Sequence, residues 1–344
     1  MEQVQSDQNQ KMKRGASIIA KNWLHLRMKQ KVLIVSSEKH VVETQILKEA
    51  FMEHSLQVDL MLLEEKGKKI GIFFDKNENI FEAYDVIIGA TDYSLVTTKA
   101  VKRARAEGKK FLSLPLSTNN GQSMLTYDFL QMDTKKSKMM ANVIKKYVDE
   151  ATYLQVKTKL GTDMRFRKKG RNAGFFNGDI RDGNGFSSAS IELYVPIEED
   201  QTNGVLYLDG SLGYIGAVKE PVRIEFQNGR IVDIEENEDG KRLKTYIESF
   251  DDDRMYVTAE FGIGLNSFAK CVGNCYIEDE SSYGTYHIGF GRNLALGGAF
   301  EACGHFDLVT HEPDIYADNR KIMERGRVLV PEPQVFLSFK ERRA

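Results

Sequence analysis

Cysteine is scarce in this chain of 344 residues, which contains only Cys271, Cys275 and Cys303. An odd and sparse set of cysteines does not build a disulfide framework and is typical of a reducing compartment. We therefore expect a cytoplasmic protein. Cys271 and Cys275 lie four residues apart, which leaves a metal role open, but we interpret them as small buried side chains.

The sequence also lacks a long apolar run and an excess of basic residues. No apolar stretch approaches the roughly 18–20 residues that span a bilayer. The N-terminal segment MEQVQSDQNQKMKRG has no apolar core, so we expect no secretory signal. The formal net charge is −2. Nucleic acid and anionic membranes both favour basic surfaces, so we expect neither as an obligatory partner.

Nucleotide-binding motifs are missing from the first half of the chain. The β-branched run KVLIVSS (31–37) predicts a buried parallel strand, but SSEKH follows in place of G-x-G-x-x-G, and no Walker motif occurs. Strand and helix patterns then alternate, with strands predicted at 58–64, 84–89 and 109–115 and helices at 40–54 and 94–107. This alternation predicts an open, doubly wound α/β sheet.

The pattern changes near residue 150. We expect a disordered tail at 1–11, the α/β domain at 12–150 and a second domain at 151–344. Within the second domain, segments such as SIELYVPI and GVLYLDGS predict short strands separated by Gly, Asn and Asp turns, and QNGR predicts a two-residue hairpin. The predicted fold class is therefore α/β, with a doubly wound first domain and a mainly β, α+β second domain.

Histidine and carboxylate side chains are concentrated between residues 259 and 307. Glu260 ends an alternating segment, His287 lies in GTYHIGFG, and His305 and Asp307 form an H-x-D pair. In an extended segment, side chains two apart point to the same side, so both members of the pair can reach one ion. Such groups are costly to bury without a metal. We therefore predict a divalent-metal site in the second domain.

A further acid, Glu192, lies upstream in the otherwise apolar segment SIELYVPI, where it is a ligand, a general base or an edge feature. Three or four carboxylates with two histidines suit two divalent ions that activate a water. Two histidines with one carboxylate would instead suit a single Fe(II). These two arrangements lead to different functions.

Several sequence blocks, taken in order, resemble one enzyme family. The blocks are GTDM (161–164), IELYVPIE, NGVLYLDGS (203–211), PVRIEFQNGRIVDIE (221–235), AEFGIGLN (259–266), EDESSYGTYHIGFG (278–291) and HFD (305–307). They resemble the leucyl aminopeptidase family of the aminopeptidase T and aminopeptidase S type, in particular its short bacterial members. The resemblance runs from about residue 30 to 330, and the superfamily is also similar to dihydroxypyridine dioxygenase.

The resemblance implies a two-metal exopeptidase, usually dimeric, that removes N-terminal residues from peptides. It implies zinc, cobalt or manganese as the metal and a small peptide or amino-acid-derived molecule as the substrate. The implied catalytic residues are Glu192 and Glu260. Asp279 is an alternative to Glu280 as a metal ligand. The implied metal ligands are Glu192, Glu260, Glu280, His287, His305 and Asp307.

Two positions depart from the family pattern. Leu294 stands where the larger peptidases have a catalytic tyrosine, and Ile191 stands where a glycine is usual. The missing tyrosine motivates an alternative, a mononuclear Fe(II) ring-cleaving dioxygenase that uses His287, His305 and Asp307. A third hypothesis is a non-peptidase member of the family with an accessory biosynthetic role.

Overall fold

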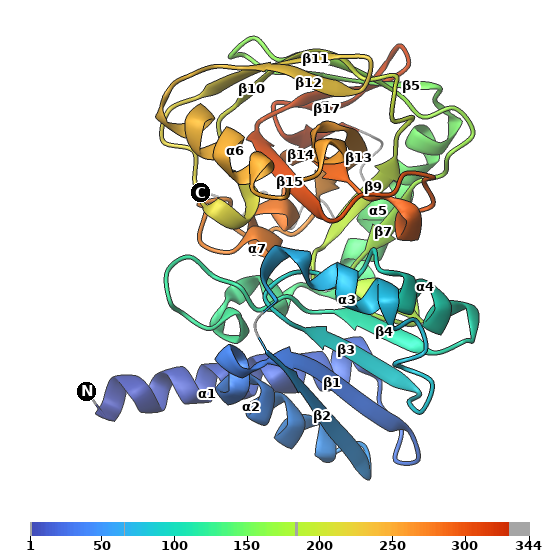
Figure 1. Ribbon diagram of the computed structural model, residues 1–344, viewed down its shortest axis with the longest axis vertical. Coiled ribbons are helices and arrows are strands. Elements are labelled where there is room, and N and C mark those ends of the chain that lie inside the picture. Colours follow the sequence, from blue (N-terminus) through green and yellow to red (C-terminus); the bar gives the residue numbers. More distant parts are fainter. Residues whose placement is uncertain (1, 65, 183–184, 330–344) are drawn as a thin grey trace. The chain divides into compact units, whose positions relative to one another are not determined.

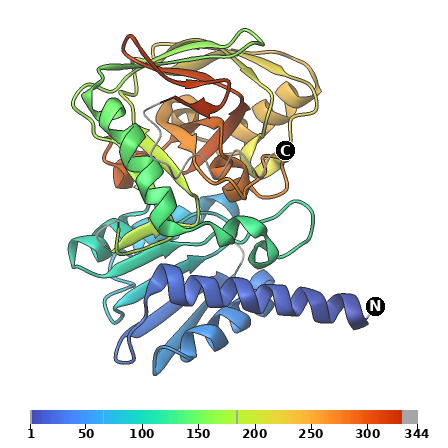
Figure 2. The same cartoon turned by 180° about the vertical axis from the view of Figure 1, so that it is seen from behind.

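The computed structural model describes residues 2–64, 66–182 and 185–329. Within these residues the chain forms two compact units (Figures 1 and 2). The first unit runs to Thr134 and includes Phe176–Ser190, whereas the second contains Lys135–Phe175 and the chain from Ile191 onward. This division differs from the boundary predicted at residue 150. Segment 176–190 contributes a strand to the first sheet, a long-range pairing that the local sequence pattern does not reveal.

The first unit is built on a parallel sheet. Its strands are β1 (Lys31–Ser37), β2 (Gln57–Leu63), β3 (Val86–Ala90), β4 (Lys110–Ser113) and β8 (Phe186–Ser188). Their order is β2-β1-β3-β4-β8, and all four pairings are parallel. The chain moves outward from β1 in one direction and then in the other, which with right-handed crossovers places helices on both faces. The predicted doubly wound α/β architecture is confirmed.

Helices cover this sheet (Figure 1). They are α1 (Glu2–Ile18), the π-helical turn η1 (Ile19–Leu24), α2 (Val41–Met52), α3 (Ile70–Lys76) and α4 (Lys99–Ala106). Because α1 begins at Glu2, the predicted disordered tail at 1–11 is wrong. The segment is rich in the helix-forming residues Glu, Gln and Lys, and Asp7 pairs with Lys11 one turn later at 3.0 Å. No helix among the described residues is long and apolar enough to cross a membrane.

The second unit contains an outer antiparallel sheet of eight strands, ordered β12-β11-β10-β6-β5-β16-β17-β18. The predicted hairpin at QNGR joins β11 to β12, with Asn228 and Gly229 both at positive φ, as a tight hairpin turn requires. The strands are β5 (Tyr153–Lys157), β6 (Asp163–Arg167), β10 (Asn203–Leu208), β11 (Val222–Gln227), β12 (Arg230–Ile234), β16 (Asp314–Ala317), β17 (Arg320–Glu324) and β18 (Arg327–Val328).

The same unit contains a central five-stranded sheet, ordered β15-β14-β13-β9-β7. These strands are β7 (Gly174–Phe176), β9 (Glu192–Pro196), β13 (Thr258–Gly264), β14 (Thr285–Gly291) and β15 (His305–His311). The pairings among β9, β13, β14 and β15 are antiparallel. Three helices accompany the two sheets: α5 (Thr134–Glu150), α6 (Glu238–Glu248) and the short α7 (Tyr276–Ser281).

An aromatic layer joins the two sheets of the second unit. Phe166 of the outer sheet packs edge-on against Phe261 of the central sheet, with ring centroids 5.3 Å apart, and Phe226 stacks on Phe290 at 6.1 Å. This layer covers the apolar face of the central sheet. The opposite face of the sheet does not take part in this packing. Short 3₁₀ turns complete the described chain at Glu38–His40, Gly67–Lys69, Met124–Thr126, Asp128–Gln131, Gly213–Ile215 (η6), Asp253–Tyr256 (η7) and Leu294–Leu296 (η8).

Candidate metal centre

The face of the central sheet opposite the aromatic layer carries acids, histidines and glycines. Side chains alternate between the faces of a strand, and cross-strand partners share a face. On the apolar face lie residues such as Phe261, Tyr286 and Ile288. The pairs on the polar face are Glu192–Gly264, Glu260–Gly289, His287–Gly262, Asp307–Gly289 and His305–Gly291. Nearly every functional side chain therefore faces a glycine on the neighbouring strand.

These glycines provide the space that the functional side chains occupy. A Cβ atom added at Gly262 would lie 1.8 Å from Nε2 of His287. One added at Gly289 would lie 2.8 Å from Oδ1 of Asp307 and from Cε1 of His305. Glycine within a strand weakens the strand and often marks a close approach, so its repetition here indicates a built site.

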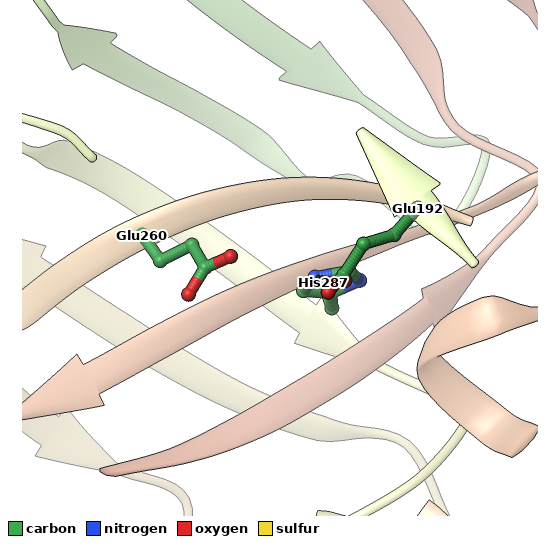
Figure 3. Close-up of side chains that lie close together, drawn as sticks. All are labelled: Glu192, Glu260 and His287. Carbon is green, nitrogen blue, oxygen red and sulfur yellow. Dashed lines mark ion pairs between the residues drawn. The ribbon is translucent and has the colours of Figure 1, made fainter. Parts of the chain in front are cut away.

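One cluster on this face contains Glu192, Glu260 and His287, all buried, with ligand atoms that lie within 4.8 Å of one another. Oε2 of Glu192 lies 2.7 Å from Nε2 of His287. Figure 3 shows the carboxylate of Glu260 turned toward this pair from the neighbouring strand. The cluster brings together residues that are up to 95 positions apart in the sequence (287 − 192).

A second cluster contains Glu260, His305 and Asp307, also within 4.8 Å of one another. Nε2 of His305 lies 3.2 Å from Oε2 of Glu260 and 3.3 Å from Oδ1 of Asp307. Glu260 therefore belongs to both clusters. The structure brings the H-x-D pair together as predicted, but it groups His287 with Glu192 rather than with His305.

The ring of His305 is held by the backbone. Its Nδ1 atom lies 2.8 Å from the carbonyl oxygen of Arg292, and an N–H at this position donates to that carbonyl. Burial would lower the pKa of His305, but Asp307 and Glu260 raise it well above its usual value, so in the metal-free protein Nε2 carries a proton as well. A cation that displaced this proton would leave the Nε2 lone pair facing the two carboxylates. A metal-ligating histidine commonly has such a partner on its other nitrogen.

Asn293 organises the loop that follows. Its amide group donates to Oε1 of Glu199 at 2.8 Å and to the carbonyl oxygen of Ala259 at 3.1 Å, and its Oδ1 atom accepts from the backbone N–H of Phe300 at 2.9 Å. Ala259 immediately precedes Glu260, and Asn293 immediately follows the residue whose carbonyl holds His305. One buried side chain thus supports the backbone beside Glu260 and His305, two of the three members of the second cluster.

Burial and neighbouring charges shift the pKa values of these groups. Burial raises the pKa of Glu260 to about 7, with His305 acting in the opposite direction. Burial alone would lower the pKa of His287, but the Glu192 carboxylate and its hydrogen bond raise it to about 9. For Asp307, burial would raise the pKa, but the neighbouring His305 brings it below its usual value. Protonated histidines thus balance the carboxylates, a balance that a bound cation would replace.

Glu280 reaches the same site from α7. Burial, followed by the charges of Glu192, Asp307 and Glu260, raises the pKa of Glu280 well above its usual value. Its neighbour Asp279 instead accepts hydrogen bonds from the Ser211 hydroxyl at 2.7 Å and from the backbone N–H groups of Val272 and Gly273 at 2.9 Å each. Of the two acids, Glu280 is therefore the one that is electrostatically coupled to the clusters.

The donor set fits a divalent cation. Four buried carboxylates repel one another, and burying uncompensated like charges costs free energy that a cation recovers. Carboxylate oxygen and imidazole nitrogen suit Zn, Mn and Fe among the metals common in proteins. The residues therefore fit one ion in either cluster, or two ions that share Glu260.

Comparison with known proteins decides the family. The sequence model of the NicX family, described as 2,5-dihydroxypyridine 5,6-dioxygenase, matches residues 75–330. This segment is more than half of the chain and includes every candidate ligand. The chain belongs to the NicX family.

A curated 2,5-dihydroxypyridine 5,6-dioxygenase from Pseudomonas putida is 26% identical to this NicX-family chain over 152 residues. The aligned segment is 41% of this chain and 43% of the relative, so it spans less than half the length of either protein. The sequence similarity is thus confined to part of the chain, and the activity of the whole relative does not transfer with it.

Two solved structures share the fold along almost its whole length. The 2,5-dihydroxypyridine dioxygenase of P. putida superposes with a TM-score of 0.77 at 19% identity and covers 94% of this chain and 98% of its own. AmpT, aminopeptidase T of Thermus thermophilus, superposes with a TM-score of 0.61 at 15% identity and covers 93% and 99%. These likenesses show a shared fold, and the specific aminopeptidase assignment is not confirmed.

The tyrosines near the candidate metal centre of this NicX-family chain lie in different environments. Tyr286 lies on the apolar face of the central sheet, and the hydroxyl of Tyr283 accepts the backbone N–H of Val328 at 3.3 Å. Leu294 begins the turn η8 and is half-buried. Tyr276 on α7 is instead coupled electrostatically to Glu280 and Asp307. Tyr276 could not be singled out from the sequence, because a helix as short as α7 has no recognisable pattern.

Proposed function

We propose that this protein is an Fe(II)-dependent dioxygenase that opens a dihydroxylated aromatic ring of the 2,5-dihydroxypyridine type. The observation that carries the proposal is the match to the NicX family over residues 75–330. The P. putida dioxygenase, which is similar in partial sequence and in fold, supports the same reaction class.

We assign the iron to Glu260, His305 and Asp307. The carbonyl of Arg292 fixes the tautomer of His305, so that its Nε2 atom faces the two acids. Fe(II) bound there would supply the electron-transfer chemistry by which molecular oxygen reacts with an electron-rich ring. This set has one histidine and two carboxylates, and thus differs from the expected set of His287, His305 and Asp307.

In this proposal His287 and Glu192 handle protons beside the metal. Their direct contact of 2.7 Å holds the imidazole in one orientation. A hydroxylated ring binds a metal more strongly once it has lost a proton. A bound cation would displace the proton that His287 holds in the metal-free protein, and His287 could then accept the ring proton while Glu192 stabilises the resulting charge. Burial on the polar face of the sheet excludes water from this pair.

A second candidate, a two-metal aminopeptidase, is favoured by one specific observation. Glu260 belongs to both clusters, so its carboxylate could bridge two ions of zinc, cobalt or manganese. Glu192 or Glu260 would then act as general base on a metal-activated water, and a small peptide would be the substrate. The similarity in fold to AmpT supports this alternative.

The homodimer expected from the aminopeptidase resemblance stays a prediction, which light scattering of the purified protein tests.

Metal content and turnover, measured on one preparation, test the proposal. Protein purified without added metal is analysed for metal identity and stoichiometry. It is then loaded with Fe(II) anaerobically and mixed with oxygen and 2,5-dihydroxypyridine. One iron per chain with oxygen consumption supports the dioxygenase. Two zinc-type ions per chain, with release of N-terminal residues from a peptide panel, would refute it in favour of the second candidate. No metal and no turnover would favour a non-enzymatic role.

A matched pair of variants links turnover to the site. Glu260→Gln removes the carboxylate that both clusters share and should reduce turnover about 100-fold or more. The control Glu225→Gln changes an acid on the outer face of the eight-stranded sheet, where it pairs with Arg223, and should leave turnover unchanged.

A further inference from the structure

Two tyrosine rings pack against each other, in a tilted arrangement, beside the candidate metal centre. The ring centroids of Tyr214 and Tyr276 lie only 3.8 Å apart, with an angle of 39° between the planes. Tyr276 is buried and Tyr214 is half-buried, so the outer ring of the pair remains accessible. A hydrogen bond links their hydroxyl groups.

The segments that carry these rings lie tightly against the strands that carry the candidate ligands. A Cβ atom at Gly213, the residue before Tyr214, would lie 2.5 Å from the carbonyl oxygen of Asp307. A Cβ atom at Gly264 of β13 would lie 2.7 Å from the carbonyl oxygen of Glu280 on α7. Only glycine permits such close approach, so η6 lies directly on β15, and α7 directly on β13.

The two segments are also joined to each other. The hydroxyl of Ser211 donates to Oδ2 of Asp279 at 2.7 Å, which connects the chain before η6 to α7. Tyr276 and Glu280 are four residues apart on α7 and therefore lie on one side of this helix. The tyrosine pair is thus held rigidly, and on the side of α7 that faces the carboxylates.

We propose that Tyr214 and Tyr276 form the wall that binds the aromatic ring of the substrate, with Tyr214 stacking on the ring and the hydroxyl oxygen of Tyr276 accepting a hydrogen bond from a ring hydroxyl. Aromatic side chains favour offset stacking on planar rings. A peptide backbone offers no such surface, so the pair selects a planar hydroxylated ring. This inference rests on the proposed function and names its substrate class.

The hydroxyl of Tyr276 keeps its proton in this environment. Burial, followed by the neighbouring Tyr214 and Glu280, raises the pKa of Tyr276 well above its usual value. The single proton of Tyr276 is donated to the Tyr214 hydroxyl, and its oxygen can accept a hydrogen bond from the substrate.

The proposal is tested by measuring how tightly the protein binds aromatic rings in the absence of oxygen, when no turnover occurs. Fe(II)-loaded protein is kept anaerobic and titrated by calorimetry with 2,5-dihydroxypyridine, catechol and hydroquinone, with cyclohexane-1,2-diol as the non-planar comparison. Tyr214→Leu should weaken binding of the planar rings by about 5- to 10-fold, and Tyr214→Phe should restore it to within about 2-fold of the unaltered protein. Tyr276→Phe, which keeps the ring, should weaken binding by about 3- to 10-fold.

The matched control is Tyr283→Phe, whose hydroxyl contacts the backbone of Val328; it should bind rings like the unaltered protein. Iron content and thermal unfolding, measured for every variant, identify any that fail to fold. The proposal is overturned if the unaltered protein binds no planar ring, or if folded Tyr214→Leu and Tyr276→Phe bind as tightly as the control. Tyrosine-dependent ring binding without oxygen consumption would support the wall and refute the dioxygenase.

Discussion

Gly262 pairs with His287 across β13 and β14, and a side chain at position 262 would overlap the imidazole, since its Cβ would lie 1.8 Å from Nε2. A glycine on one strand is therefore as necessary to the site as the histidine on the next. This relationship extends to Gly289, which makes room for Asp307 and His305.

Gly262→Ala should displace His287 from its contact with Glu192 and reduce turnover by about 100-fold, while the fold survives with a loss of a few kcal/mol from overpacking. Oxygen consumption by the Fe(II)-loaded protein measures the first effect, and thermal unfolding the second. The control Ile263→Val changes the adjacent residue on the apolar face and should cost about 1 kcal/mol of stability without altering turnover. Unchanged turnover in folded Gly262→Ala would show that His287 handles no proton in the reaction.

Asn293→Ala should reduce metal affinity by about 10- to 100-fold, because the side chain supports the backbone next to both Glu260 and His305. Competition with a chelator of known affinity gives the value. Asn237, which caps α6 by accepting the N–H of Gly240, provides the comparison. Asn237→Ala should lose about 1 kcal/mol of stability and retain its metal. Equal metal affinities in the two variants would contradict a positioning role for Asn293.

Metal binding should release protons and should strengthen as the pH rises. In the metal-free protein the pKa of His287 is raised to about 9 and that of Glu260 to about 7, so both groups hold protons that a cation must displace at pH 6. The affinity should therefore rise from pH 6 to at least pH 9, because His305, whose pKa is also raised well above its usual value, must lose its Nε2 proton as well. Calorimetry at one pH in two buffers of different ionisation enthalpy counts the released protons. An affinity that does not vary with pH would contradict this coupling between proton release and metal binding.

Tyr286→Phe should stabilise the protein by about 1 kcal/mol. The hydroxyl of Tyr286 is buried on the apolar face and has no hydrogen-bond partner among the described residues, so its burial carries an uncompensated desolvation cost. Chemical denaturation of both proteins measures the difference. Metal content and ring binding should not change, because the hydroxyl points away from the candidate ligands. A destabilised variant would indicate a bound water or another partner at this hydroxyl.

Local sequence patterns predicted individual strands and turns better than they predicted which strands pair across long stretches of the chain. The buried run that became β1 and the QNGR hairpin follow from neighbouring residues alone. In contrast, β8 lies within a Gly- and Asn-rich stretch and becomes a strand only by pairing with β4. The predicted boundary near residue 150 therefore misses the return of residues 176–190 to the first unit.

Prediction of the candidate metal centre from the sequence was limited in the same way. The candidate ligands could be chosen by residue type and by resemblance, since few acids lie in such apolar segments. Which ligands lie together in one cluster could not be predicted from residue type or resemblance. It depends on the register of β9 on β13, which brings Glu192 next to His287. Glycine as a partner of each ligand, and Tyr276 on a six-residue helix, likewise appear only once the strands are paired.

The path of the chain between the two units limits how the protein can be divided. The second unit contains residues 135–175 and resumes at Ile191, and Glu192 follows one residue later. A gene fragment that starts at residue 135 would still encode β8 but not β4, and would leave that strand unpaired. Production of the metal centre in isolation therefore requires residues 176–190 to be replaced by a short link, because simple truncation removes only part of the first unit.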